Sequence, residues 1–306
     1  MTWSGQSVLV TGATGFIGAH VCRRLGEAGA QVHGVGRRPT AQISGMARYH
    51  AGDLADASFV ERVLEEARPR CVFHLASHVV GARDLDQVAS TLRDGLIATV
   101  NILTAAVRHG GPRVVLAGSL EEPEPEGEPL VPSSPYAAAK LAGSAYARMF
   151  HALYELPVVH ARIFMVYGPG QRDLRKLIPY TILSLLRGEA PRVSSGDRLV
   201  DWIYVDDVAQ GLLRLGETVG VEGQRVDLGT GVLTSVRDVV LQIARLVRPD
   251  IEPEFGAVAA RPMEQVRRAD VAAAEHAMGW SPGCSLAEGL ARTVDWYSVE
   301  LAEGRL

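Results

Sequence analysis

A tyrosine and a lysine stand four residues apart in the run Ser133-Ser134-Pro135-Tyr136-Ala137-Ala138-Ala139-Lys140. Ser134 is placed to cap a helix whose first position is Pro135, so Tyr136 and Lys140 share one helical face. An ammonium group beside a phenol favours the phenolate and lowers a phenol pKa that is ordinarily about 10. We therefore expect Tyr136 to exchange a proton with a substrate alcohol or carbonyl near neutral pH.

A serine hydroxyl is a candidate partner for this pair. Ser119 stands close after the apolar run Val114-Val115-Leu116-Ala117, at the carboxyl end of an expected buried strand, where a hydroxyl can orient a reacting oxygen. Each feature also has a structural explanation, because Y-x-x-x-K pairs occur on helix surfaces and serines often occupy turns. The combination of Ser119, Tyr136 and Lys140 nevertheless predicts a catalytic group.

A glycine-rich run, Thr11-Gly12-Ala13-Thr14-Gly15-Phe16-Ile17-Gly18, follows the first expected strand and opens a helix. Glycines there let the backbone approach a pyrophosphate, whose charge the free amides of a helix N-terminus stabilise. Position between a strand and a helix favours a dinucleotide site over an ordinary turn. The residues expected to hold the cofactor are Gly12, Thr14, Gly15, Phe16, Ile17 and Gly18.

The end of the second expected strand, Val32-His33-Gly34-Val35-Gly36-Arg37-Arg38, bears on the choice of cofactor. An NAD site usually places a carboxylate here for the ribose 2′-hydroxyl, whereas a 2′-phosphate favours a nearby guanidinium. Gly36 supplies no carboxylate, and Arg37 and Arg38 supply positive charge. This segment favours NADP(H) over NAD(H), although both cofactors are considered. The alternative to a cofactor role is that Arg37 and Arg38 are solvated surface residues.

Strand-like and helix-like segments alternate along the chain, most regularly before about Gly168. Expected strands lie at 7–10, 31–35, 70–75, 113–117, 157–163 and 225–228, and expected helices at 16–28, 57–67, 98–109 and 135–153. This alternation predicts an α/β fold, a doubly wound parallel sheet with ligands at the carboxyl ends of its strands. We expect a dinucleotide-binding domain over 1–167, with a returning segment near 202–230, and a smaller, mainly substrate-binding C-terminal lobe over 168–306.

Composition narrows the class of protein. The 306 residues are 47% hydrophobic and carry a formal net charge of −4, which argues against nucleic acid or an anionic membrane as the main partner. The three cysteines are far apart and match no zinc motif, so we expect reduced thiols and no metal. We found no apolar run of membrane-spanning length and expect a cytoplasmic protein.

Taken together, these motifs resemble the extended short-chain dehydrogenase/reductase family, in its nucleotide-sugar epimerase, dehydratase and reductase branch. The resemblance covers residues 8–270 approximately and is specific for the family, though not for one reaction. Its marks are Val10 to Gly18, Gly52-Asp53-Leu54, His74-Leu75-Ala76, Tyr136 with Lys140, Val166-Tyr167-Gly168-Pro169-Gly170-Gln171, Asp201-Trp202-Ile203-Tyr204-Val205-Asp206-Asp207-Val208 and Arg261-Pro262.

The resemblance implies further site residues in the cofactor-binding half. Asp53 and Leu54 would contact the adenine, and Ala76 and Ser77 would line the cofactor. Lys140 would bond the nicotinamide ribose as well as tune the catalytic tyrosine.

Substrate binding is where the sequence departs from the family pattern. The resemblance implies that Arg261 contacts the diphosphate of a sugar nucleotide, a pairing that guanidinium geometry favours. Gly95 stands where an asparagine is usual, Met165 replaces another asparagine, and Val200 replaces an arginine. Arg198, two residues before Val200, is the candidate that compensates for this lost charge.

Glu121 poses a question about the reaction. In family members that remove water across sugar carbons 5 and 6, a carboxylate two residues after the catalytic hydroxyl is the base, and Glu121 has this spacing from Ser119. Leu120 lies between them, where an acid or a hydroxyl is common. Because Glu122, Glu124, Glu126 and Glu128 are close by, we expect a solvated acidic loop and no dehydration base.

The sequence therefore favours an NADP(H)-dependent oxidoreductase that reduces a keto group on a nucleotide-linked sugar. A nucleotide-sugar 4-epimerase or 4,6-dehydratase is the alternative within the family. A non-catalytic dinucleotide-binding sensor is the alternative from another class, and retention of the three catalytic candidates argues against it.

We also expect a homodimer, in which the helices at 98–109 and 135–153 pair with their copies about a two-fold axis. This expectation comes from the family resemblance. Small residues on the second helix permit the close approach of helices. They are Ala137, Ala138, Ala139, Ala142, Gly143 and Ala145.

Overall fold

The computed structural model describes residues 3–39, 43–78, 83–124, 130–259, 263 and 265–306. The chain divides into two compact units. The first unit comprises Met1–Ile163, Ala209–Asp227 and Ala272–Trp280, and the second comprises Phe164–Val208, Leu228–Val271 and Ser281–Leu306.

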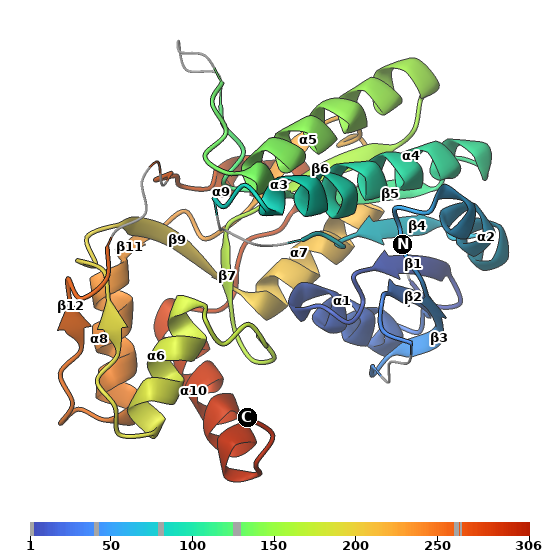
Figure 1. Ribbon diagram of the computed structural model, residues 1–306. Coiled ribbons are helices and arrows are strands. Elements are labelled where there is room, and N and C mark those ends of the chain that lie inside the picture. Colours follow the sequence, from blue (N-terminus) through green and yellow to red (C-terminus); the bar gives the residue numbers. More distant parts are fainter. Residues whose placement is uncertain (1–2, 40–42, 79–82, 125–129, 260–262, 264) are drawn as a thin grey trace. The chain divides into compact units, whose positions relative to one another are not determined.

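A seven-stranded sheet forms the centre of the first unit (Figure 1). Its strand order is β10-β6-β5-β4-β1-β2-β3, and the pairings from β3 through β6 are all parallel. The strands are β1 (Ser7–Thr11), β2 (Gln31–Gly36), β3 (Met46–Ala51), β4 (Cys71–His74), β5 (Arg113–Ser119), β6 (Val158–Ile163) and β10 (Arg225–Leu228). The α/β fold with a doubly wound sheet, predicted from the sequence, is confirmed.

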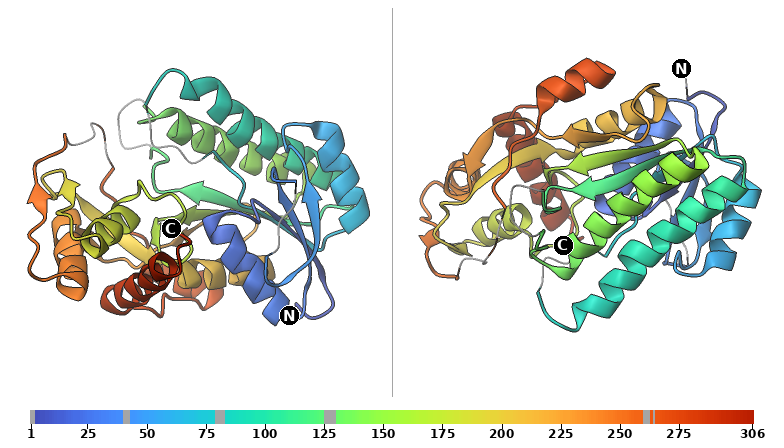
Figure 2. Two further views of the ribbon diagram at one scale, coloured as in Figure 1. Left: turned by 60° about the horizontal axis from the view of Figure 1, so that its bottom comes forward. Right: turned by 90° about the horizontal axis from the view of Figure 1, so that it is seen from above.

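Helices cover both faces of this sheet (Figure 2). One face packs against α2 (Ala57–Ala67), α4 (Ala98–Arg108) and α5 (Pro135–Tyr154), in a core that includes Val72. The next residue, Phe73, points to the opposite face, where it lies with Trp3 against Gly216 of α7 (Val205–Glu217). The remaining helical elements of the first unit are α1 (Phe16–Glu27), which contacts β1 to β3, α3 (Gln87–Thr91), the π-helix η1 (Leu92–Ile97) and α9 (Val271–Met278).

The second unit has its own small sheets and core. Strand β9 (Leu199–Tyr204) pairs in parallel with β7 (Met165–Tyr167) and antiparallel with β11 (Leu233–Ser235). The other elements are β8 (Arg192–Val193), β12 (Glu254–Phe255), α6 (Leu177–Leu186), α8 (Val236–Val247) and α10 (Leu286–Ala302).

Within the part of the chain that the structure describes, no helix is long and apolar enough to cross a membrane.

A buried histidine ties three elements of the first unit together. His74 Nδ1 lies 2.8 Å from Thr11 Oγ1 on β1, and Nε2 lies 3.0 Å from Thr99 Oγ1 on α4. The Thr99 hydroxyl donates to the Gly95 carbonyl at 2.6 Å, so Nε2 carries the proton and Nδ1 accepts. Burial, with a smaller contribution from the charge of Lys140, lowers the pKa of His74 to about 3. The fold therefore holds a neutral imidazole here.

We predict that His74 makes the fold less stable in acid. Because the folded-state pKa lies below the ordinary value of 6.5, the stabilisation is present above about pH 6.5 and falls by about 1.4 kcal/mol per pH unit as pH drops towards 3. The test is the free energy of unfolding against pH for the parent and for His74→Gln, which cannot titrate. The advantage of the parent should shrink as pH falls, whereas the exposed control His276→Gln should leave the pH dependence unchanged.

Candidate functional site

The end of β5 and the start of α5 bring together Ser119, Tyr136 and Lys140, all in the first unit. The Ser134 hydroxyl accepts a hydrogen bond from the Ala137 amide at 3.1 Å and begins α5, so Tyr136 and Lys140 occupy its first two turns. The Ser119 hydroxyl forms a hydrogen bond with Tyr136. Lys140 Nζ lies 5.8 Å from the centre of the Tyr136 ring. The hydroxyl, the phenol and the ammonium thus form one cluster.

The turn after β5 directs the Ser119 hydroxyl. The Glu121 amide donates to Ser119 Oγ at 3.2 Å, which occupies one acceptor position and leaves the hydroxyl proton for another oxygen. The Ser134 hydroxyl donates to Glu121 Oε2 at 3.4 Å, and the charge of Glu121 acts on Tyr136. Leu120, which lies between Ser119 and Glu121 in the sequence, is buried and presents no polar group.

The glycine-rich run forms a cradle whose shape depends on missing side chains. Gly12 has a φ of 69°, and a Cβ there would lie 2.8 Å from the Ala76 amide nitrogen. A Cβ on Gly18 would overlap the Gly12 carbonyl. Helix α1 begins after Gly15 with no side chain capping it and no acid in its first turn, as far as the described residues show. Free amides at Phe16, Ile17 and Gly18 fit a pyrophosphate, so the residues present suit a dinucleotide.

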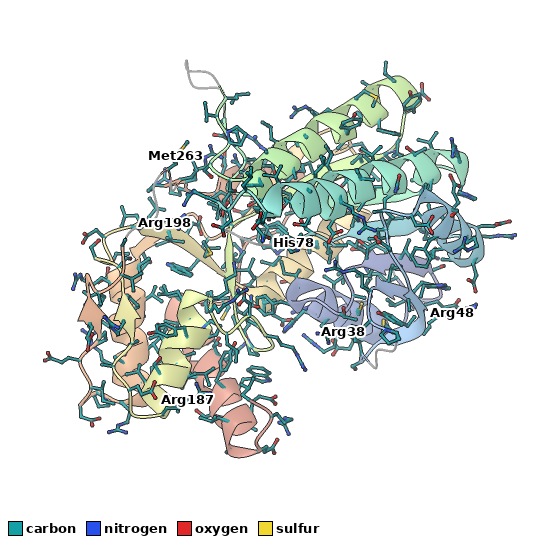
Figure 3. The ribbon with its side chains drawn as sticks, in the orientation of Figure 1. Arg38, Arg48, His78, Arg187, Arg198 and Met263 are labelled. Atoms are coloured by element: carbon teal, nitrogen blue, oxygen red, sulfur yellow. The ribbon has the colours of Figure 1, made fainter. Side chains whose placement is uncertain are left out.

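Charged side chains lie past the end of β2. Arg37 Nη1 lies 2.7 Å from Asp94 Oδ2, and Arg93 pairs with both Asp94 and Asp53. Arg38 is exposed (Figure 3), and its carbonyl accepts a hydrogen bond from Tyr49 at 2.9 Å. Thr14 lies beside Gly36, since a Cβ there would be 3.2 Å from Thr14 Oγ1. The guanidinium of Arg37 is therefore already paired with a carboxylate.

The remaining cofactor candidates lie at the ends of neighbouring strands. Asp53 accepts the Ala55 amide at 2.9 Å, and the Leu54 carbonyl accepts the side-chain amide of Asn101 at 2.9 Å. The Ala76 amide donates to Thr11 Oγ1 at 3.2 Å, while Ser77 follows it in the partly buried segment after β4. These contacts fix the loops that border the cradle.

The substrate candidates belong to the second unit. Arg198 Nη2 donates to the Gln265 carbonyl at 3.2 Å, and Arg261 lies outside the described residues. Val200 is buried in the core of this unit. Asp201, also buried, accepts the amides of Thr230, Gly231 and Ala269 and so fixes the loops beside β9.

Comparison with known proteins places these features in a family. Residues 8–229 match the model of the NAD dependent epimerase/dehydratase family. The chain belongs to this family. It is 34% identical to a UDP-glucose 4-epimerase of Mycolicibacterium smegmatis, over 94% of this chain and 97% of that protein, and 32% identical to a dTDP-glucose 4,6-dehydratase of Streptomyces antibioticus, over 95% and 92%. The solved structure of MoeE5 in complex with UDP-glucose and NAD superposes with a TM-score of 0.85 at 34% identity, covering 96% of this chain and 99% of that one.

The protonation of Tyr136 differs from the sequence-based expectation for this epimerase/dehydratase family member. Burial raises the pKa of Tyr136 well above its ordinary value; the hydrogen bond from Ser119 opposes this, and the charges of Glu121 and Glu122 add to it. Burial also lowers the pKa of Lys140 to about 8, against the charge of Glu122. The expected net lowering of the tyrosine pKa is wrong for the protein alone, because burial and the two carboxylates outweigh the hydrogen bond from Ser119. Tyr136 holds its proton at neutral pH.

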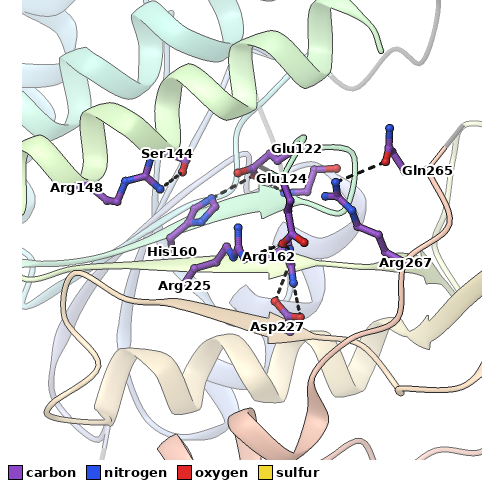
Figure 4. Close-up of polar contacts among 11 residues, drawn as sticks. Glu122, Glu124, Ser144, Arg148, His160, Arg162, Arg225, Asp227, Gln265 and Arg267 are labelled. Atoms are coloured by element: carbon purple, nitrogen blue, oxygen red, sulfur yellow. Dashed lines mark hydrogen bonds and ion pairs between the residues drawn. The ribbon is translucent and has the colours of Figure 1, made fainter. Parts of the chain in front are cut away.

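The acidic segment after Ser119 also differs from the expectation. Glu122 is buried, and Glu124 pairs with Arg162 and Arg225 (Figure 4). The expected solvated loop is wrong for Glu122 and Glu124, because Glu122 accepts the Ser119 amide and lies beside His160, and Glu124 pairs with arginines of β6 and β10. Glu126 and Glu128 lie outside the described residues.

Sequence reasoning missed the residues beneath this turn. Arg162 binds Asp227 through two contacts of 2.7 and 2.6 Å, and His160 lies 3.2 Å from Glu122. A signal was present, because His160 and Arg162 alternate with apolar residues in the otherwise apolar strand β6. Polar groups buried in a sheet must find partners, and acidic residues were the available ones.

We predict that Tyr136→Phe abolishes turnover and keeps the fold and cofactor affinity, since it removes only the transferable proton. The expected loss in kcat is at least several hundredfold, within the roughly 10²–10⁴ range of general acid–base catalysis. Tyr154→Phe, an exposed change on the same helix, is the matched control and should be neutral. Most of the parental rate in Tyr136→Phe would refute the proton-transfer role.

We predict that Glu121→Gln moves the pH profile without abolishing activity. The Glu121 charge raises the pKa of Tyr136, so its removal should stabilise the phenolate and shift the rising limb of the rate of alcohol oxidation to lower pH. Glu155→Gln, at the distal end of α5, should leave the profile in place. A loss of several hundredfold, with water released by the parent to a 4-keto-6-deoxy sugar, would instead make Glu121 a dehydration base.

Proposed function

We propose that this protein is a nucleotide-sugar 4-epimerase that oxidises a sugar hydroxyl and reduces the resulting ketone on its other face. The observation that carries the proposal is the cluster of Ser119, Tyr136 and Lys140 in the same unit as the glycine cradle. The 34% identity to a UDP-glucose 4-epimerase over nearly the whole of both chains supports this choice within the family.

The chain's own residues supply the proton chemistry. Ser119, oriented by the Glu121 amide, would hold the reacting oxygen beside Tyr136. Tyr136 Oη would take the hydroxyl proton during oxidation and return it during reduction, so no net proton is consumed. When bound, the nicotinamide would accept and return the hydride, and its oxidised form would add a positive charge that favours the phenolate.

Lys140 and the glycine cradle would position the cofactor. The Lys140 ammonium would bond the nicotinamide ribose, a role that the family resemblance implies. The amides of Phe16, Ile17 and Gly18 would hold the pyrophosphate, and the missing side chains of Gly12 and Gly18 would let it approach the backbone. Arg198 and Arg261 would bind the diphosphate of the sugar nucleotide.

The NADP(H)-dependent ketoreductase is the second candidate, because Gly36 leaves the end of β2 without a carboxylate and two arginines follow. The pairing of Arg37 with Asp94 weakens this case. A carboxylate beside Arg37 offsets the charge that a 2′-phosphate would need, and NAD binds without that demand. A 4,6-dehydratase has less support, because Leu120 offers no acid for the leaving hydroxyl.

The test is to incubate the protein with UDP-glucose or UDP-galactose and a catalytic amount of NAD, and to identify products by NMR. A 4-epimerase yields the same mixture from both sugars with no net change in nicotinamide absorbance. Stoichiometric oxidation of NADPH with a 4-keto sugar nucleotide would favour the ketoreductase instead. An Arg37→Ala/Arg38→Ala variant that loses NADP(H) affinity but not NAD(H) affinity would also favour it.

We also propose that the protein is a homodimer through α4 and α5. Ala138, Ala145, Tyr146 and Leu153 are exposed on α5, and Leu153 is 68% exposed. Small side chains with apolar neighbours suit the close packing of a helix against its own copy. We predict a dimer mass by light scattering at micromolar concentration, and a monomer mass would contradict the proposal.

A further inference from the structure

Glu122 is a buried carboxylate that the proposed reaction does not use. It is 2% exposed, and its Oε1 accepts a hydrogen bond from the Ser119 amide at 2.7 Å. Its own amide donates to the Ser119 carbonyl at 3.1 Å. The two bonds close the turn after β5 and fold the carboxylate back under the strand end, so Glu122 holds both sides of the Ser119 backbone.

A histidine from the neighbouring strand fixes this carboxylate. His160 of β6 is buried and places Nε2 3.2 Å from Glu122 Oε1 (Figure 4). Both side chains lie against Gly118, where a Cβ would be 2.6 Å from the same oxygen. The absence of a side chain at Gly118 therefore makes room for the pair directly beside the catalytic serine.

The catalytic lysine contacts the same short stretch of strand. Lys140 Nζ donates to the Ala117 carbonyl at 2.6 Å, two residues before the amide that Glu122 accepts. The ammonium and the carboxylate thus bond to opposite ends of the segment 117–119. A buried charge is stable only where an opposite charge or hydrogen bonds replace its hydration.

We propose that Glu122, held by His160, is a positioning residue that fixes the Ser119 backbone and supplies the counter-charge for the buried Lys140 ammonium. The catalytic importance of Ser119 and Lys140 rests on the proposed function. The two actions of Glu122, however, are measurable without any substrate.

The charges around Glu122 are consistent with an ionised carboxylate. Burial raises its pKa, but the hydrogen bond and charge of His160, the Ser119 amide and the charge of Lys140 together bring it below the ordinary value. Burial lowers the pKa of Lys140 to about 8, and Glu122 limits that fall. Three other titratable groups act in this cluster. Tyr136 has a protonated phenol, the charge of Glu121 acts on Tyr136, and His74, whose pKa the charge of Lys140 helps to lower, is neutral.

Direct titration of Lys140 tests the counter-charge. Lys140 and Lys176 are the two lysines of the sequence, so NMR of protein labelled with 13C-lysine follows Lys140 with Lys176 as an internal reference. In Glu122→Gln, which keeps an acceptor for the Ser119 amide, the Lys140 midpoint should fall by roughly one pH unit. Glu124→Gln is the matched control on the same turn and should leave it in place. Equal Lys140 midpoints in the parent and in Glu122→Gln would overturn the counter-charge.

Hydrogen exchange tests the positioning of Ser119. Glu122→Asp keeps the charge but withdraws the oxygen by one methylene, so the Ser119 amide should exchange at least tenfold faster while the Lys140 midpoint stays near its parental value. Unchanged exchange of Ser119 in Glu122→Asp would overturn the positioning role, and this measurement stands even if Glu122→Gln fails to fold. The titration of Lys140 and the hydrogen exchange of Ser119 need no substrate and no turnover. A negative result in either would therefore contradict the role of Glu122 without contradicting the proposed function.

With an active substrate, a third measurement separates positioning from general stability. Glu122→Gln should lower kcat while the KM for the sugar nucleotide stays within about twofold, because the variant changes the proton chemistry and not the binding of the nucleotide. A rise in KM with unchanged kcat would contradict the role.

Discussion

Burial of the Lys140 charge is the constraint that organises the end of β5. An ammonium taken out of water loses its hydration, and here the Ala117 carbonyl and the charge of Glu122 replace part of it. Glu122 in turn needs partners and finds the Ser119 amide and His160. Each buried polar group therefore requires a partner for its own charge or hydrogen bonds. The missing side chain at Gly118 leaves the space in which Glu122 and His160 meet.

A second set of buried charges holds the turn from its other end. Arg162 on β6 binds Asp227 on β10 in a two-point contact and also pairs with Glu124. Such a contact fixes orientation as well as distance, because a guanidinium and a carboxylate are both planar. The turn that carries Glu121 and Glu122 is thus tied to two strands of the sheet. A catalytic hydroxyl on a loose turn would lose much of its directional effect.

The local patterns of the sequence predicted the scaffold well. The six expected strands are present as β1, β2, β4, β5, β6 and β10, because each is a short apolar run and the sheet buries it on both faces. The start of α5 at Ser134 and Pro135 also agrees, since capping depends on adjacent residues. The strands β3, β7, β8, β9, β11 and β12 were missed. Four of them have only two or three residues, and the two longer ones, β3 and β9, are each interrupted by a charged residue, Arg48 and Asp201.

The interactions between distant residues were not predictable in the same way. Glu124 meets Arg162 across 38 positions, Arg162 meets Asp227 across 65, and Arg37 meets Asp94 across 57. Nothing local distinguishes a glutamate that will face water from one that a buried arginine will bind. The acidic segment therefore looked solvated from the sequence.

The protonation of Tyr136 bears on how the proposed reaction would run in both directions. A buried phenol beside two carboxylates keeps its proton, which suits it to donate to a ketone. To take a proton from an alcohol, Tyr136 would first have to lose its own proton to solvent, and the positive charge of a bound oxidised nicotinamide would favour that phenolate. In the proposed reaction, hydride transfer from the sugar would neutralise that charge, and the proton taken from the alcohol would leave Tyr136 as the donor again. Proton and hydride transfer would then be coupled by electrostatics, with the charges of Glu121 and Glu122 favouring the protonated phenol.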